Sequence, residues 1–193
     1  MEHAKDAARR LFSESIKAKQ DFMADRANLD AIGLAAQTLI ESLKAGGKVL
    51  LFGNGGSAAD CQHFAAELIV RFEKERRSLP AIALTTDTSI LTAAGNDYDF
   101  DSVFSRQIEG LGADKDVAIA ISTSGMSPNV LRGASIARKK GMPVIALSGR
   151  DGGELAAIAD IAIIANHPVT ARIQEVHGTV IHILCKLVED AFA

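Results

Sequence analysis

The chain has 193 residues, of which 48% are hydrophobic and 23% are charged, so it can form one globular domain with a sizeable core and a cleft. Its formal net charge of −3 gives no general attraction for nucleic acid. No apolar run is long enough to cross a bilayer, and the charged N-terminus is unlike a secretory signal. We therefore expect a cytoplasmic protein without nucleic-acid or membrane partners.

Residues 4–45 show the apolar spacing of two helices, which end at Gly46 and Gly47. These two helices could pack as an N-terminal helical hairpin. No linker or change of composition divides the rest of the chain. We therefore expect a single domain, in which residues 1–45 form the hairpin and residues 46–193 form an α/β core.

The core begins where helical spacing gives way to short apolar runs separated by turn residues. Strands that are apolar on both faces and alternate with helices predict a five-stranded parallel sheet covered on both sides, a doubly wound α/β fold. In such sheets ligands bind beyond the carboxyl ends of the strands. The predicted strands cover residues 48–53, 80–86, 116–123, 143–149 and 161–165, and the predicted helices cover roughly residues 57–74, 87–110, 127–140, 153–159 and 170–191.

Two of these strands end in small polar loops that lead directly into helices. The first loop is GNGGS, residues 53–57, and the second is STSGMS, residues 122–127. Glycine lets the backbone approach a ligand, hydroxyl groups donate to oxygen anions, and a helix N-terminus favours negative charge, so both loops suit a phosphate group. Either loop could instead be a tight turn capped by serine.

Known nucleotide-binding motifs explain these loops less well. The chain has no GxxxxGK[ST] motif, which argues against a P-loop NTPase. Gly53, Gly55 and Ala58 satisfy a relaxed GxGxxA pattern. However, the acidic residue expected about 20 positions later falls within RFEKER, a segment that we interpret as the end of a helix. A dinucleotide-binding fold would also leave the second loop unexplained.

Candidate catalytic residues lie on two of the predicted helices. His63 and Glu67 are four residues apart and share one face of the helix after the first loop, a spacing that can hold a metal or pair a base with a proton carrier. An exposed pair of this kind is more commonly a solvated surface. The last helix adds Gln174, His177 and His182 on an apolar background. A single histidine there would more commonly belong to the core, but the polar cluster favours a site.

Four segments together carry a family resemblance: GNGGSAADCQHFAAEL (53–68), LTAAGNDYDFDSVFSRQ (91–107), STSGMSPNV (122–130) and RIQEVHGTVIHIL (172–184). Over nearly its whole length the chain resembles the phosphoheptose isomerase branch of the sugar isomerase (SIS) domain family. The resemblance implies an enzyme that converts sedoheptulose 7-phosphate into D-glycero-D-manno-heptose 7-phosphate, the first step of ADP- or GDP-heptose synthesis for lipopolysaccharide or another glycan. It also implies a homotetramer with one zinc ion per subunit.

The resemblance further implies roles for particular residues. The second loop would hold the phosphate, and Met126 stands there in place of an expected asparagine, which affects only fine substrate contacts. The implied substrate-binding residues are Asn54, Gly55, Gly56, Glu67, Asn96, Asp97, Ser122, Thr123, Ser124, Ser127 and Gln174. The implied metal ligands are His63, Glu67, Gln174 and His182, nitrogen and oxygen donors that suit zinc.

Conversion of a ketose into an aldose moves a proton between C1 and C2 through an enediol, which needs a base and an acid. We hypothesise that Glu67 is the base and His182 the acid, both reaching the head of a sugar whose phosphate the loops hold. Zinc would orient the substrate or polarise its oxygens, and Glu67 would have to leave the metal to act. Gln174 and His182 are separated by about 12 Å of helix. Either Gln174 lies at a loosened helix start, or the ligands come from different subunits.

Two other functions are open to a chain with these loops. Some SIS proteins close to this branch bind the bacterial replication initiator and are not known as isomerases. The presence of Glu67 and of an intact STSG loop favours the isomerase. A sugar-phosphate-sensing regulator would usually carry a DNA-binding domain, for which we expect 193 residues to leave no room beside the sheet.

Overall fold

The five apolar runs form one parallel sheet with the strand order β2-β1-β3-β4-β5 in a computed structural model that describes residues 2–193. Every residue of β1, β3 and β4 is buried, because helices cover both faces of the sheet. The predicted doubly wound α/β fold is therefore confirmed. The strands are β1 (Val49–Gly53), β2 (Ala81–Ala83), β3 (Val117–Ser122), β4 (Val144–Gly149) and β5 (Ile161–Ala165).

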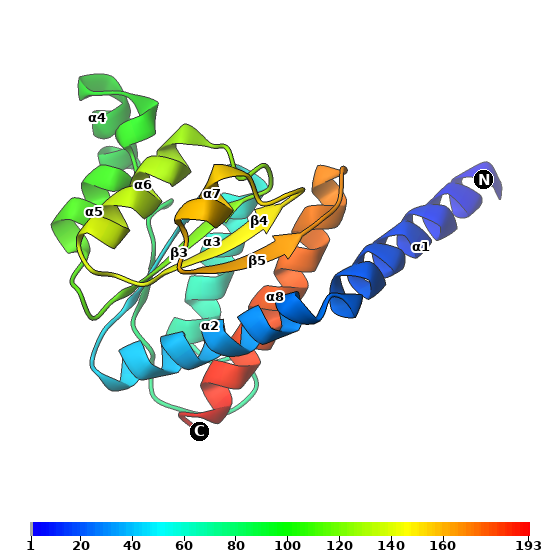
Figure 1. Cartoon of the computed structure of the whole chain (residues 1–193), viewed down its shortest axis with the longest axis horizontal. Coiled ribbons are helices and arrows are strands. Elements are labelled where there is room, and N and C mark those ends of the chain that lie inside the picture. The colour runs from blue at the N-terminus through cyan, green and yellow to red at the C-terminus, as the bar shows by residue number, and fades with distance from the viewer. Residues whose placement is uncertain (1) are drawn as a thin grey trace.

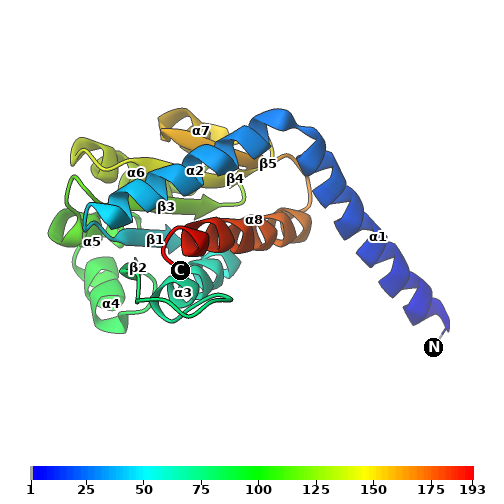
Figure 2. The ribbon, with the colours of Figure 1, turned by 90° about the horizontal axis from the view of Figure 1, so that it is seen from below.

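Two layers of helices enclose this sheet (Figure 1, Figure 2). The helices are α1 (Glu2–Ala24), α2 (Arg26–Lys44), α3 (Gly56–Ile69), α4 (Thr88–Asp97), a 3-10 turn η1 (Phe100–Ser102), α5 (Ser105–Leu111), α6 (Pro128–Lys139), α7 (Gly153–Ile158) and α8 (Thr170–Asp190). On one face α2, α3 and α8 pack against strand residues such as Leu51 and Ile119, and on the other α4 to α7 pack against Leu50 and Ala120. No helix among residues 2–193 is both long enough and apolar enough to span a membrane.

The two N-terminal helices are confirmed, but their arrangement as a hairpin is wrong. A single residue, Asp25, joins α1 to α2, and its carboxylate accepts a hydrogen bond of 3.0 Å from the Ala27 N–H, which caps α2. So short a connection does not turn α1 back along α2, and α1 projects away from the sheet (Figure 1, Figure 2). Along α1 the side chains of Phe12, Ile16 and Met23 are exposed.

Two predicted helices differ from the observed ones. The helix predicted over 57–74 ends at Ile69, and the residues after it form a loop that is bonded to the carboxylate of Glu189 on α8. RFEKER therefore lies in a loop, not at the end of a helix. The helix predicted over 87–110 is divided at Asp99, whose backbone is extended and whose carboxylate accepts hydrogen bonds from Ser102 and Arg132.

Candidate active site

The two glycine- and serine-rich loops lie next to each other at the carboxyl edge of the sheet. They follow β1 and β3, which are neighbours at the point where the strand order changes direction, and α/β sheets open a ligand-binding crevice at such a point. The side chains of Asn54, in the first loop, and Asn129, at the start of α6, form two reciprocal hydrogen bonds of 2.8 and 2.9 Å. These bonds join the two loops into one surface.

In the first loop, Gly55 and Gly56 have no side chains, so their backbone is accessible to a ligand at this surface. Gly55 has a φ of +55°, a conformation that favours glycine, and α3 begins directly after it at Gly56. A Cβ atom at Gly56 would overlap Nε2 of Gln174 on α8, so glycine leaves room for the Gln174 amide. The N-terminus of α3 and this amide therefore meet at one point, which suits a polar or anionic ligand.

Three hydroxyl groups gather in the second loop. Ser122 Oγ lies 3.2 Å from Ser127 Oγ and 3.5 Å from Ser124 Oγ, directly before α6. Backbone N–H groups within the loop donate to two of these hydroxyls, and Thr123 lies half-buried among them. Hydroxyl groups can rotate toward an anion, and the first N–H groups of a helix lack partners within the helix. This loop therefore has the chemistry of a phosphate site.

Three of the candidate catalytic and metal-binding side chains meet between α3 and α8. His63 Nε2 lies 3.0 Å from Glu67 Oε1 and 3.5 Å from His182 Nε2. The two imidazole rings are edge to face with centroids 5.0 Å apart, and the Phe72 ring also packs against His182 at 5.5 Å. The Glu67 side chain is 23% exposed, so a small molecule can reach it. The predicted base and the predicted acid thus both contact one side chain, that of His63.

The chemistry of these donors fits zinc, but one chain supplies an incomplete set. Zinc binds imidazole nitrogen and carboxylate oxygen at about 2.0–2.2 Å, which places two tetrahedral ligands roughly 3.3 Å apart. The separations of 3.0 and 3.5 Å between the donor atoms are near that value. Across residues 2–193, however, no group of three or more His, Cys, Asp or Glu side chains is arranged so that it could hold a metal ion. In one chain the three side chains form a hydrogen-bonded cluster, not a closed metal site.

The fourth implied ligand, Gln174, lies apart from this cluster. Gln174 lies within the regular helix α8. A loosened helix start at Gln174, one of the two explanations considered from the sequence, is therefore wrong. Helices α3 and α8 run side by side in the same direction, because Gly56 lies against Gln174 while His63, further along α3, lies against His182. About 12 Å of helix separates Gln174 from His182. On one chain, therefore, the Gln174 amide lies against Gly56 and not beside the His182 imidazole.

Other candidate residues also lie away from the loops within one chain. Glu67 is most of the length of α3 away from Gly56, about 16 Å along the helix axis. Asn96 and Asp97 are exposed at the end of α4, where the Asn96 amide donates to the Asp97 carboxylate at 2.8 Å. In the part of the chain that the structure describes, no hydrogen bond links either residue to the two loops. The candidate residues therefore form three separate groups on one chain: the two loops with Gln174, the cluster of His63, Glu67 and His182, and the pair Asn96 and Asp97.

His177, which the polar cluster on the last helix suggested as a site residue, belongs to the core. It is fully buried, and its Nε2–H donates to the Ser148 carbonyl oxygen at 3.0 Å. Burial lowers the pKa of His177 to about 4, and this hydrogen bond offsets the shift only in part. The ring is therefore neutral near pH 7 and holds α8 against β4.

Two residues that shape the site were not predicted from the sequence. Asn129 binds Asn54, and the sequence does carry a signal for it, since it is a polar residue directly after Pro128 at a helix start. Phe72 packs against His182, but its segment has helical character in the sequence. Only the folded loop brings Phe72 to the site, so no local pattern could have found it.

The chain is similar to known proteins over most of its length. Residues 11–149 match the family model of the SIS domain. A phosphoheptose isomerase of Aquifex aeolicus is 54% identical over 187 residues, 96% of each chain, and one of Helicobacter hepaticus is 59% identical over 160 residues, 83% of this chain and 82% of that one. The solved structure of a phosphoheptose isomerase from Neisseria gonorrhoeae is 46% identical, with a TM-score of 0.91 over 97% of this chain and 99% of that chain. The chain belongs to the SIS domain family, in its phosphoheptose isomerase branch.

Proposed function

We propose that the chain is an aldose–ketose isomerase that converts sedoheptulose 7-phosphate into D-glycero-D-manno-heptose 7-phosphate, a precursor of heptose-containing glycans such as lipopolysaccharide. The observation that carries the proposal is the cluster of His63, Glu67 and His182 on two helices that begin beside the phosphate-binding loops. The Glu67 carboxylate and the His182 imidazole both contact His63, and a carboxylate and an imidazole can supply the base and the acid of an enediol reaction. The relatives described as phosphoheptose isomerases support the substrate class.

In the proposed reaction Glu67 takes the proton from C1 of the ketose and returns it to C2. His182 moves a proton between O1 and O2 as the carbonyl group changes place, so the product has the same atoms as the substrate. His63 Nε2, 3.0 Å from the Glu67 carboxylate, holds that carboxylate in place when no metal ion is bound. The hydroxyl groups of the second loop and the N-terminus of α6 bind the phosphate.

We also propose that a second copy of the chain completes each site, within a homotetramer in the cytoplasm. The distance of about 16 Å along α3 between Gly56 and Glu67 supports this, because no side chain spans it. The projecting helix α1 supports it as well, since Phe12 is 72% exposed and Ile16 is 56% exposed. A second copy of the chain covering this apolar stripe would remove it from water.

We further propose that each subunit binds one zinc ion when the side chains of His63, Glu67 and His182 turn from their hydrogen-bonded arrangement toward the ion, with a Gln174 side chain from a neighbouring copy as the fourth ligand. The donor types and the separations of 3.0 and 3.5 Å support the first three ligands. When bound, zinc would polarise the sugar oxygens at the reacting carbons.

Incubation of the protein with sedoheptulose 7-phosphate, followed by NMR, tests the proposed reaction. We expect an aldoheptose phosphate from the wild type, and a kcat lower on the order of 100-fold or more in Glu67→Gln and His182→Gln, with unchanged circular dichroism. Gln62→Ala is the matched control, because Gln62 is an exposed neighbour of His63 and, among residues 2–193, its side chain bonds only to Thr85. Wild-type rates in both site variants would overturn the assigned roles. No turnover by the wild type would favour the initiator-binding alternative.

Removal of metal is tested separately. We expect chelation to abolish turnover and added Zn²⁺ to restore it. We also expect isothermal titration to show one Zn²⁺ per subunit in the wild type and none in His63→Ala. Full activity after exhaustive chelation would contradict the zinc proposal and leave the roles of Glu67 and His182 in place.

A further inference from the structure

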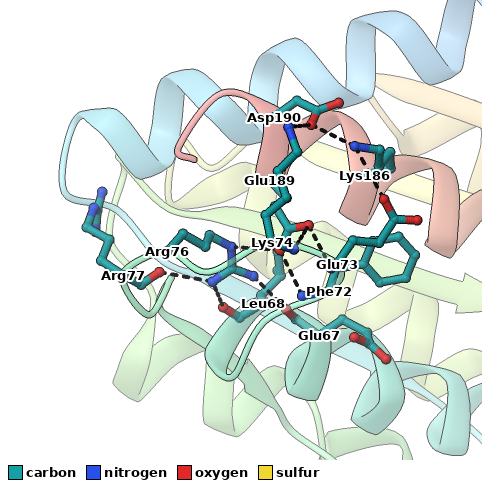
Figure 3. Close-up of polar contacts among 10 residues, drawn as sticks. All are labelled: Glu67, Leu68, Phe72, Glu73, Lys74, Arg76, Arg77, Lys186, Glu189 and Asp190. Atoms are coloured by element: carbon teal, nitrogen blue, oxygen red, sulfur yellow. Dashed lines mark hydrogen bonds and ion pairs between the residues drawn. The ribbon is translucent and has the colours of Figure 1, made fainter.

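The loop after α3 wraps around the carboxylate of Glu189, which is fully buried near the end of α8 (Figure 3). Oε1 of Glu189 accepts a hydrogen bond from the Phe72 N–H at 2.8 Å, and Oε2 accepts from the N–H groups of Glu73 and Lys74 at 2.7 and 2.9 Å. Burial acts to raise the pKa of Glu189, but these three bonds and the charge of Arg76 outweigh it and hold that pKa below its usual value. An ionised carboxylate therefore fixes three consecutive backbone groups.

Arg76 connects this carboxylate to the end of α3. Its side chain is 1% exposed, and its Nε lies 3.4 Å from Glu189 Oε1. Its Nη2 donates to the Glu67 carbonyl oxygen at 2.7 Å and its Nη1 to the Leu68 carbonyl oxygen at 2.8 Å (Figure 3). The last carbonyl groups of a helix lack partners within it, and a cation there is favourable. Arg76 thus holds the backbone of Glu67 itself.

The same loop also reaches the proposed acid. Phe72, whose N–H binds Glu189, packs its ring against His182 with centroids 5.5 Å apart. His182 Nε2 lies 3.5 Å from His63 Nε2 on the opposite helix. The buried carboxylate is therefore connected to the proposed base through Arg76 and to the proposed acid through Phe72.

We propose that Glu189 and Arg76 are positioning residues that hold Glu67 and His182 in the relative position that proton transfer requires. The inference rests on the proposed isomerase function and concerns two residues that do not touch the substrate. A buried ion pair contributes little net stability compared with apolar side chains of the same size. Arg76 binds the backbone of Glu67, and the loop held by Glu189 places the Phe72 ring against His182. The role of the ion pair is therefore to fix the positions of these two reacting residues.

The kcat and KM of Glu189→Gln test the inference, with Asp190→Asn as the matched control. Asp190 is the next residue on α8, and its carboxylate binds Lys74 of the same loop at 2.7 Å, but both side chains are exposed. A displacement of about 1 Å in a reacting group costs up to about 100-fold in rate, so we expect kcat of Glu189→Gln to fall 10- to 100-fold. We expect its KM to stay near the wild-type value, because the phosphate-binding loops lie at the other end of α3. Asp190→Asn should keep the wild-type kcat.

Arg76→Lys is the second variant, and it decides the question if Glu189→Gln fails to fold. Lysine keeps a positive charge beside Glu189 but lacks the planar group that binds two carbonyl oxygens at once, so kcat should again fall with KM unchanged. Wild-type kcat in the folded variants would overturn the inference, and so would a loss that appears only as a raised KM with melting of the fold. If the wild type does not turn over sedoheptulose 7-phosphate, the proposed function is wrong. If the wild type turns it over and the variants do so at the same rate, only the positioning role of Glu189 and Arg76 is wrong.

Discussion

Gly56→Ala tests whether the contact between the start of α3 and Gln174 matters for the reaction. Gly56 is the first residue of α3 and its φ is not positive, so alanine fits its backbone. The new Cβ atom would nevertheless overlap Gln174 Nε2 and lie 3.0 Å from its Cδ. Because non-bonded carbon atoms prefer about 3.5–4.0 Å, the Gln174 amide must retreat by on the order of 1 Å.

The stability and the activity of Gly56→Ala should respond differently. Alanine restricts the unfolded chain and favours a helix, and the end of a glutamine side chain can move aside, so the free energy of unfolding should stay equal or rise by up to about 1 kcal/mol. If Gln174 binds substrate or metal from its present position, a displacement of about 1 Å should lower kcat/KM on the order of 100-fold. The variant is therefore expected to be stable and nearly inactive.

Urea titration and the NMR rate assay measure these two quantities. Gly33→Ala is the matched control, because Gly33 lies within α2 and an added Cβ atom would meet nothing within 4 Å. It should gain the same helix stability and keep the wild-type rate. A wild-type kcat/KM in Gly56→Ala would refute the role of Gln174 at this position. A loss of several kcal/mol would instead refute the claim that the Gln174 amide can retreat.

Three further predictions concern the loops, the core and α1. Asn129→Ala removes two hydrogen bonds of 2.8 and 2.9 Å to Asn54, so urea titration should show a loss of about 1–3 kcal/mol in the free energy of unfolding. Because burial lowers the pKa of His177 from 6.5 to about 4, the unfolded chain binds more protons between these values. The stability from this group is thus complete above pH 6.5 and falls by about 3 kcal/mol as the pH drops to 4, and His177→Gln should flatten that part of the profile. Phe12→Asp with Ile16→Asp should lower the mass measured by sedimentation velocity, and an unchanged mass would show that this stripe is not an interface.

The strands and the two loops were predictable because their signals are local. A run that is apolar on both faces has few stable environments, and a parallel sheet between two helix layers is one of them. Parallel strands place their carboxyl ends at the same edge, so GNGGS and STSGMS had to lie at one edge of the sheet. The pairing of Asn54 with Asn129 follows from that placement and not from any spacing along the chain.

The end of α3 was not predictable because it depends on a distant residue. RFEKER has helical composition, yet its backbone forms a loop whose N–H groups bind the Glu189 carboxylate. Glu189 lies 117 residues after Phe72 in the chain. The prediction of a helical hairpin was wrong for a related reason. Apolar spacing identifies α1 and α2 as helices, but it does not show which surface covers the apolar side chains of α1. The sequence also indicated His63, Glu67 and His182 as partners without showing how far their cluster lies from the loops.

That separation leads to a test of whether sites are shared between copies of the chain. Suppose that the loops of one copy bind the phosphate while Glu67 of a neighbouring copy removes the proton. A copy with Glu67→Gln then still has intact loops, and a copy with Ser122→Ala still has an intact base. After dissociation and reassembly of an equal mixture, half of the loops and half of the bases are intact, so about one quarter of the sites should combine both. Two variants that are each inactive should then regain about a quarter of the wild-type activity. A mixture that stays inactive, although mass spectrometry shows mixed oligomers, would mean that each chain builds its own site, and α3 would then have to bring Glu67 to the loops by a change in shape.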